Sequence, residues 1–287
     1  LDLEAGKVIS SASRALPPAP ACHDIFSDTG SCDASQTSPD SRVIVNPLLS
    51  RHRALVEQAA AFIPGYREDL KHTEQRVLGK LARPLLHSLA GSSGPGLLTA
   101  RAMLLAVPGA DLAILNPRAV RADLPAGDVT YGRLFSALPF ENRLATAKLT
   151  GAELKALLNA GMSYRGDIFQ VAGVRLTARC GPPPSVLGLQ DRRGRPLDPK
   201  KFYRVVLSDY LLSGGDGLGP VLEKIPAHRK RVLPEGTVRG AMEQLLGSSN
   251  KPANSADAPV LSTSQPQLVL EGGPCNAGKT PVRYLCR

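Results

Sequence analysis

The segment from Asp111 to Gly151 constrains the fold most strongly, because a short apolar run inside it ends at an abrupt polar break. The run, Leu112 to Leu115, has the length and composition of a buried strand. Asn116 and Pro117 follow directly, and an Asn-Pro pair is typical of the start of a loop. The segment therefore predicts a rigid strand whose end presents polar side chains from a loop.

Two cations and an aromatic ring follow this break. Arg118 and Arg121 come first, and Phe140 follows a proline after an amphipathic stretch. Phosphate recognition uses cations and hydrogen-bond donors, whereas recognition of a base uses a flat ring on which the base stacks. A second segment, Leu207 to Gly219, supplies another ring, Tyr210, and a Gly-Gly-Asp-Gly turn. If the two segments meet in space, they form a nucleotide pocket.

The motifs in these segments resemble the C-terminal domain of the 5'-nucleotidase family, which includes bacterial UDP-sugar hydrolases and mammalian ecto-5'-nucleotidases. Five motifs occur in the family's order: NPRAVR from Asn116, GDVTYGRLFSALPF from Gly127, LTG from Leu149, FQVAGV from Phe169 and DYLLSGGDGLG from Asp209. The resemblance extends from about Arg76 to Gly219. It implies an α+β domain, in which helices pack against a mixed β-sheet.

The resemblance also implies roles for the matching positions. Phe140 and Tyr210 would hold the base between their rings, Asp216 and Asn116 would contact the ribose and the polar edge, and Arg121 would bind the phosphate. The residues that we expect to bind substrate are Asn116, Arg118, Arg121, Phe140, Tyr210, Gly214, Gly215 and Asp216.

Two phosphate-binding motifs of the family are altered here. The arginine of its R-E motif falls on Gly91, and Pro117, Arg118 and Ala119 replace the glycines of its NGGGIR loop. Arg118 is the candidate replacement for the lost cation. These departures leave an alternative, in which the chain is a degenerate, non-catalytic module that holds nucleosides or no ligand.

The resembled family hydrolyses phosphoric esters with two divalent metal ions, which its N-terminal metallophosphatase domain binds. This chain shows no Asp/His/Asn cluster of that kind, so we expect no catalytic residue, no metal site and no cofactor in it. Residues 1–10 resemble the last strand of such a domain. We therefore expect a missing catalytic half upstream, and activity as a 5'-nucleotidase or UDP-sugar hydrolase only when the two halves are joined. The expected partners are that domain and a nucleotide or nucleoside, which is AMP-like or a nucleotide sugar.

Composition divides the rest of the chain. Residues 11–45 are rich in Ser, Pro and Asp and are predicted to form a linker. Residues 46–246 hold the substrate-binding domain. Residues 247–267 have the low complexity of a disordered linker, and residues 268–287 are predicted to form a strand-like piece and a cysteine loop.

The five cysteines indicate the redox environment. Cys22 with Cys32 and Cys275 with Cys286 would each close a short loop, which leaves Cys180 as a buried thiol. Such loops are typical of oxidising compartments, so we expect an extracytoplasmic protein, either periplasmic, secreted or at the cell surface.

The net charge of +10 favours anionic partners. It leaves a second alternative, a basic adhesion or nucleic-acid-binding protein. The basic residues are dispersed, however, and lack the repeated aromatics of single-strand binders, so no specific nucleic acid is expected. No run of about 18 apolar residues occurs, so no membrane span is expected.

One motif is misleading. Residues 273–280 match the phosphate-binding pattern G-x-x-x-x-G-K-T, but Pro281 follows at once, where the pattern needs a helix. We therefore interpret it as a basic turn and expect no ATP site.

Periodicity and turn residues predict the elements. Thr150 and Glu153 have the spacing of a capping box, and Gly173 is expected to form a bulge within one strand. The expected strands are 76–81, 112–115, 169–178 and 203–207, and the expected helices are 46–62, 96–107, 150–159 and 238–245.

Overall fold

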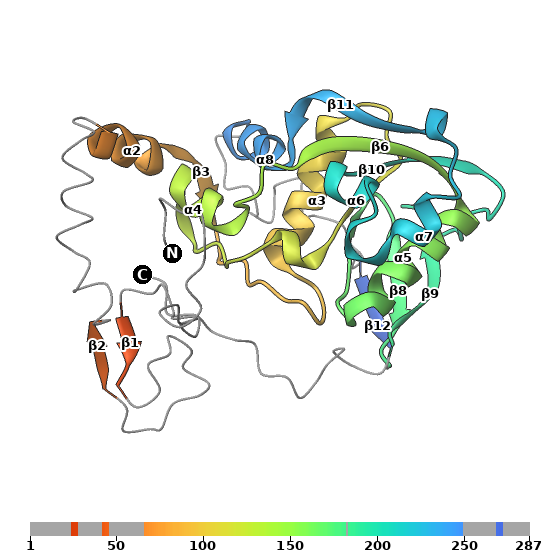
Figure 1. Ribbon diagram of the computed structural model, residues 1–287, viewed down its shortest axis with the longest axis horizontal. Helices are drawn as coiled ribbons and strands as arrows, with labels where there is room; N and C mark the ends of the chain where they lie inside the picture. Colours follow the sequence, from red (N-terminus) through yellow and green to blue (C-terminus); the bar gives the residue numbers. More distant parts are fainter. Residues whose placement is uncertain (1–23, 28–41, 46–65, 182, 249–267, 272–287) are drawn as a thin grey trace, which may run out of the picture. The chain divides into compact units, whose positions relative to one another are not determined.

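The computed structural model describes residues 24–27, 42–45, 66–181, 183–248 and 268–271 (Figure 1). The chain divides into two compact units, one of residues 1–67 with 280–287 and one of residues 68–279. In the first unit, β1 (Asp24–Phe26) pairs antiparallel with β2 (Val43–Val45). The second unit contains every other element described below, except that the first two residues of α2 (Tyr66–Gln75) belong to the first unit.

A five-stranded mixed sheet forms the centre of the second unit. Its strand order is β11 (Lys230–Thr237), β6 (Arg143–Thr150), β10 (Phe202–Ser208), β4 (Leu112–Leu115) and β7 (Gln170–Ala172). β4 and β10 are parallel, whereas β6 and β7 run antiparallel to them. All four residues of β4 are buried, which explains why its sequence is continuously apolar.

Helices cover both faces of this sheet, because successive side chains of each strand point to opposite faces. On one face lie α3 (Gly94–Ala106) and α8 (Val238–Gly247), which pack against Leu115 and Val206. On the other lies α5 (Gly151–Arg165), which packs against Ile114 and Val205 (Figure 1). The mixed sheet with its packed helices confirms the predicted α+β class.

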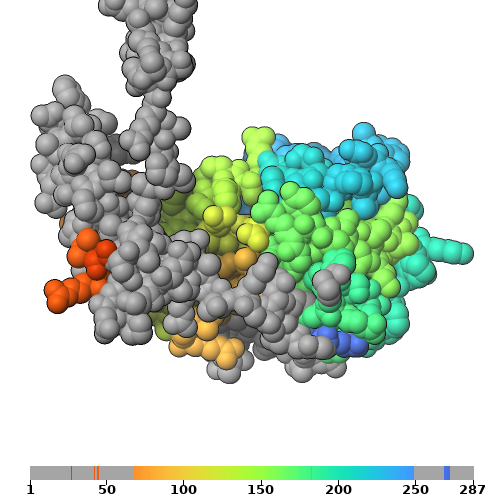
Figure 2. Space-filling model, turned by 60° about the horizontal axis from the view of Figure 1, so that its bottom comes forward, coloured from red at the N-terminus to blue at the C-terminus, as the bar shows by residue number. Residues whose placement is uncertain are grey.

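Smaller elements complete the unit. The strands β12 (Leu268–Glu271), β8 (Arg175–Arg179) and β9 (Ser185–Gln190) form a second sheet, in which β12 lies beside β8 (Figure 2). β3 (Val77–Leu81) pairs with β5 (Gly127–Thr130). The remaining helices are α4 (Tyr131–Ala137), α6 (Asp209–Leu212) and α7 (Gly219–Leu222), with the 3₁₀ helices η2 (Pro117–Ala119), η3 (Gly215–Gly217) and η4 (Ala227–Arg229).

Most predicted elements are confirmed to within a few residues, and the capping box of α5 is present. The Thr150 Oγ1 atom accepts a hydrogen bond from the Glu153 backbone N at 3.2 Å, and Glu153 Oε2 accepts one from the Thr150 backbone N at 2.7 Å. The helix runs to Arg165, six residues beyond the predicted end. It ends at Gly166, whose φ of 76° places it in the left-handed region that terminates helices.

The prediction of one bulged strand over 169–178 is wrong. The chain turns at Gly173, which has a φ of 88°, so that β7 joins the central sheet and β8 joins the second sheet. A Cβ atom at this position would come within 2.4 Å of the Asp111 carbonyl oxygen, so only glycine fits. The predicted helix at 46–62, residues 249–267 of the second linker and the motif at 273–280 lie outside the described residues. The predicted linker 11–45 is described only at 24–27 and 42–45, where it contains the paired strands β1 and β2.

The prediction that Cys180 is a buried free thiol is wrong, because Cys180 is half-buried and disulfide-bonded. The predicted pairs, Cys22 with Cys32 and Cys275 with Cys286, lie outside the described residues. Spacing along the chain did not reveal the bond at Cys180, because pairing depends on which cysteines the fold brings within bonding distance.

Candidate functional site

Both segments that the sequence singles out meet at one edge of the central sheet. Asn116 follows the end of β4 and Tyr210 follows the end of β10, and these two strands are parallel. Phe140 precedes β6 and Asp167 precedes β7, and both strands run antiparallel to their neighbours. The ends of β4 and β10 therefore lie at the same edge of the sheet as the starts of β6 and β7. In sheets with parallel strands, ligands bind outside the carboxyl ends of the strands.

A hydrogen-bonded triad connects the two segments. Asn116 Nδ2 donates to Asp216 Oδ2 at 2.7 Å, and the Tyr210 hydroxyl donates to Asp216 Oδ1 at 3.0 Å. Burial, and then the hydrogen bond to Asp216, raise the pKa of Tyr210, so its hydroxyl stays protonated as a donor. The Asn116 side-chain oxygen is buried and has no hydrogen-bond partner among the described residues. A buried acceptor without a partner is rare in folded proteins and needs an explanation, such as a bound ligand or water.

The glycine-rich turn places Asp216 beside the Tyr210 ring. Asp216 has a φ of 49°, a left-handed conformation that is uncommon for a residue other than glycine. Gly214 has a φ of 98°, and a Cβ atom at Gly215 would lie 2.5 Å from the Tyr210 ring. Gly215 therefore lets the backbone approach the ring closely, and Gly214 provides the left-handed conformation of the turn. Their predicted contact with substrate stays a prediction.

The two rings are exposed, and a carboxylate joins their segments. Phe140 is 45% exposed and Tyr210 is 43% exposed. In the described part of the chain, neither ring stacks on another aromatic residue. Asp209 Oδ1 accepts hydrogen bonds from the backbone N of Arg143 at 3.1 Å and of Tyr210 at 2.8 Å. The Arg121 guanidinium lies 5.9 Å from the centre of the Phe140 ring, a cation–π distance.

Sequence reasoning missed several charged residues near these groups. Arg118 Nε lies 2.5 Å from Oδ2 of Asp167, whose side chain is 8% exposed, so this arginine is anchored by an ion pair. His87 accepts or donates a hydrogen bond at 3.2 Å between its Nδ1 and Ser93 Oγ, and its backbone N donates to Asp123 Oδ1 at 2.6 Å. Burial lowers the pKa of His87, and the charge of Asp123 opposes this shift.

These residues lie in loops without periodicity, so no local pattern identified them. Asp167 had one signal, because a carboxylate beside the apolar pair Ile168 and Phe169 requires a cationic or hydrogen-bonding partner when it is buried.

A fully buried glutamine supports the loop near His87. Gln170 Oε1 accepts a hydrogen bond from the Ser93 backbone N at 3.0 Å, and its Nε2 donates to the carbonyl oxygens of Gly91 at 2.9 Å and Ile168 at 2.8 Å. The side chain thus satisfies three backbone groups. It belongs to the FQVAGV motif, so the sequence flagged the position without revealing its role.

Within the described ranges, no group of three or more His, Cys, Asp or Glu side chains has the arrangement of a metal site. No helix in the same ranges has an apolar stretch long enough to cross a bilayer.

Comparison with known proteins places this chain in a family. The model of the 5'-nucleotidase C-terminal domain matches residues 77–224, more than half of the chain. Protein UshA of Yersinia enterocolitica is 34% identical over 123 residues, which cover 42% of this chain and 22% of that protein. NAD 5'-nucleotidase of Haemophilus influenzae is 32% identical over 146 residues, which cover 45% of this chain and 24% of that protein.

A solved structure has the same fold. The 5'-nucleotidase precursor of Thermus thermophilus aligns with a TM-score of 0.64 and 23% identity, over 82% of this chain and 47% of that chain. The chain therefore corresponds to about a quarter of the length of those two curated relatives and about half of this structure. With the motifs, the fold and the family model in agreement, the chain belongs to the 5'-nucleotidase C-terminal domain family.

Proposed function

We propose that the second unit binds a nucleoside or nucleotide at the edge of the central sheet. The observation that carries this proposal is the triad of Asn116, Asp216 and Tyr210, which joins two segments about a hundred residues apart. Its carboxylate and the free Asn116 oxygen are acceptors suited to ribose hydroxyls or a base amino group. The exposed rings of Phe140 and Tyr210 offer faces on which a base stacks.

The phosphate would meet the arginines at the same edge. Arg121 approaches the Phe140 ring, so a base on that ring carries its phosphate toward the Arg121 guanidinium. Arg118 is already paired with Asp167, which neutralises part of its charge. Arg121 is therefore the principal phosphate ligand in this proposal, and Arg118 has a secondary role.

The reaction itself would be completed elsewhere. Two of the relatives named above are named as 5'-nucleotidases. The proposed role of this domain in such an enzyme is to hold the nucleoside while an N-terminal metallophosphatase domain supplies two divalent metals. Those metals would activate water and polarise the phosphate. The described side chains do not fit such a metal pair, so no hydrolytic step is assigned to them.

The proposed location is outside the cytoplasm. The disulfide at Cys180 supports it, because stable disulfides form in oxidising compartments such as the periplasm.

We expect Arg121→Ala to weaken AMP binding more than adenosine binding, because only AMP carries the phosphate that the guanidinium contacts. Loss of one charge-assisted contact should weaken AMP by roughly tenfold. Calorimetric titration of both ligands into wild type and variant measures the difference.

Lys224→Ala removes one exposed cation away from the site and serves as control. Equal losses for AMP and adenosine would contradict the assignment. Failure of the wild type to bind either ligand at millimolar concentration would favour the degenerate module, which Gly91 in place of the family arginine already suggests.

We also expect the purified chain to release no phosphate from AMP with Mg²⁺, Mn²⁺ or Zn²⁺. The reason is that its described residues offer no set of metal ligands. A colorimetric phosphate assay tests this, with an intact 5'-nucleotidase as positive control. Metal-dependent release that disappears when a residue of this chain is mutated would overturn the proposal that this chain binds substrate and the N-terminal domain catalyses hydrolysis.

A further inference from the structure

A cavity lies on the central sheet, toward the edge opposite the candidate nucleotide site. It has a volume of about 730 Å³ and is lined by residues of β6, β10 and β11, including Lys148, Arg204 and Arg231. Phe202 and Asp111 also line it, and they stand at the start of β10 and before β4. Asn116 and Tyr210 follow the other ends of those strands. The volume is within the range of small-molecule sites, which is about 300–1,000 Å³.

The cavity contains positively charged side chains on three neighbouring strands, Lys148, Arg204 and Arg231, which we call the charge ladder, and we call the cavity the ladder cavity. Lys148 on β6 lies directly opposite Arg204 on β10, and Arg231 on β11 lies opposite Thr146, the next residue of β6 on the same face. Like charges directly opposite each other destabilise a sheet. Like charges that no carboxylate neutralises lower the stability of the folded sheet. Natural proteins keep such unfavourable arrangements mainly at functional sites.

The ladder has little compensation within the described residues. Asp111 is the only carboxylate in the lining, and its Oδ2 accepts a hydrogen bond from the Arg204 backbone N at 2.7 Å. The Arg204 side chain donates through Nη1 to the Pro108 carbonyl oxygen at 3.1 Å, a neutral partner. Lys148 and Arg231 form no ion pair with a described residue. Their charges are therefore available to an anion.

An exposed ring holds two of the cations together. Lys148 Nζ and Arg229 Cζ each lie 5.1 Å from the centre of the Phe202 ring, which is 45% exposed. Arg229 is also paired with Glu153 at 2.6 Å, while its Nε atom is buried and has no hydrogen-bond partner in the described part of the chain. A ring orients cations without neutralising them, whereas a carboxylate would do both.

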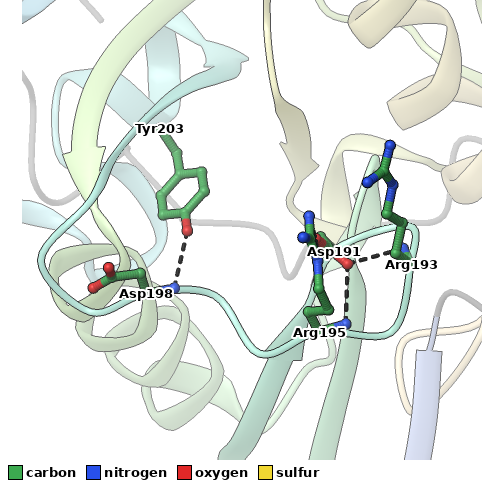
Figure 3. Close-up of polar contacts among 5 residues, drawn as sticks. All are labelled: Asp191, Arg193, Arg195, Asp198 and Tyr203. Atoms are coloured by element: carbon green, nitrogen blue, oxygen red, sulfur yellow. Dashed lines mark hydrogen bonds and ion pairs between the residues drawn. The ribbon is translucent and has the colours of Figure 1, made fainter.

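The adjoining cavity provides a contrast. It has a volume of about 630 Å³, and its arginines lie beside three carboxylates, those of Asp111, Asp191 and Asp198. The Asp191 carboxylate is bound by residues of the turn that follows it (Figure 3). Its Oδ1 accepts hydrogen bonds from the backbone N atoms of Arg193 at 2.8 Å and Arg195 at 3.0 Å. Its other oxygen accepts from Arg195 Nε at 2.9 Å. The charges there are largely balanced, so the ladder cavity is the stronger anion site.

We propose that the ladder cavity is a second anion site that binds a condensed phosphate, such as pyrophosphate or tripolyphosphate. Adjacent strands lie about 4.8 Å apart, so the three strands present their cations in a row. A single phosphate meets only part of this row, whereas a chain of phosphates lying across the strands contacts Arg204, Lys148 and Arg231 together. The site shares no residue with the nucleotide site and does not depend on it.

Isothermal titration of tripolyphosphate into the full chain tests this inference. We expect Lys148→Ala/Arg231→Ala to bind roughly tenfold more weakly or worse than wild type, because two direct charge contacts are lost. The matched control, Lys71→Ala/Lys224→Ala, removes the same charge from exposed positions outside the cavity and should retain wild-type affinity. Phe202→Leu keeps every charge but removes the orienting ring, so we expect an intermediate loss. Orthophosphate should bind more weakly than tripolyphosphate.

Three results would overturn the inference. The first is no binding of tripolyphosphate to wild type at millimolar concentration. The second is an equal loss in the control pair, which indicates attraction to overall charge. The third is loss of binding in Arg121→Ala with retention in Lys148→Ala/Arg231→Ala, which places the phosphates at the nucleotide site. Lys148 and Arg231 are exposed, so their replacement should not disturb folding, and circular dichroism verifies this.

Discussion

Replacement of Phe140 or Tyr210 by alanine is expected to weaken adenosine binding by roughly tenfold or more, because stacking of a base on one ring contributes about 1–3 kcal/mol. Phe140 has an exposed ring with no aromatic neighbour among the described residues, so its removal leaves the packing of the core intact. Tyr210→Ala also removes the hydroxyl that donates to Asp216, so its effect should be at least as large.

A matched variant separates the ring from the hydroxyl. Tyr210→Phe keeps the stacking face and loses only the hydrogen bond to Asp216, so it should retain most of the affinity for adenosine. Phe135→Ala removes a ring of similar exposure, 44%, from α4 and serves as control. Calorimetric titration of adenosine into these four variants and the wild type measures the contribution of each ring to affinity. Unchanged affinity in both Phe140→Ala and Tyr210→Ala would show that these two rings do not hold the base.

The largest expected effect on stability comes from Gln170. Gln170→Met keeps the shape of the side chain but leaves the Ser93 backbone N and the carbonyl oxygens of Gly91 and Ile168 without their partner. Each buried polar group left unpaired costs about 1–3 kcal/mol, so we expect the free energy of unfolding to fall by roughly 3 kcal/mol or more. Urea denaturation followed by circular dichroism measures this change.

The control for this experiment is Gln244→Met on α8. Gln244 is exposed and its side chain forms no hydrogen bond with a described residue, so its replacement should change the free energy of unfolding by less than about 0.5 kcal/mol. If the two variants lose stability equally, the buried hydrogen bonds of Gln170 do not hold the Gly91–Ser93 loop, and another contact must be found.

Local sequence patterns predicted the elements of this fold because their causes are local. The apolar run that forms β4 and the Thr150 capping box depend on residues a few positions apart, and both are present in the structure. The convergence of Asn116 with Asp216 could be predicted only through family motifs, since the hydrogen bond spans a hundred positions. Composition alone contains no information on strand order.

The failures have a common physical origin in long-range geometry. The turn at Gly173 is imposed by the Asp111 carbonyl, which lies far away in sequence, so alternation alone suggested one strand instead of two. The bond at Cys180 depends on which cysteines the fold brings together, which spacing along the chain did not reveal. Asp167 and His87 occupy loops, where neither periodicity nor propensity distinguishes a site residue from an ordinary surface residue.

The carboxylate of Asp209 has a consequence for the thermodynamics of recognition. Because it binds the backbone of Arg143 and of Tyr210 at once, the loop that carries Phe140 and the helix that carries Tyr210 are tied together in the free protein. The entropy of ordering these two segments is thus lost during folding instead of at the moment a ligand arrives. A ligand that binds between segments that are already ordered keeps more of its interaction energy as affinity. A chain without this tie would have to order both segments on binding, and it would bind the same ligand with lower affinity.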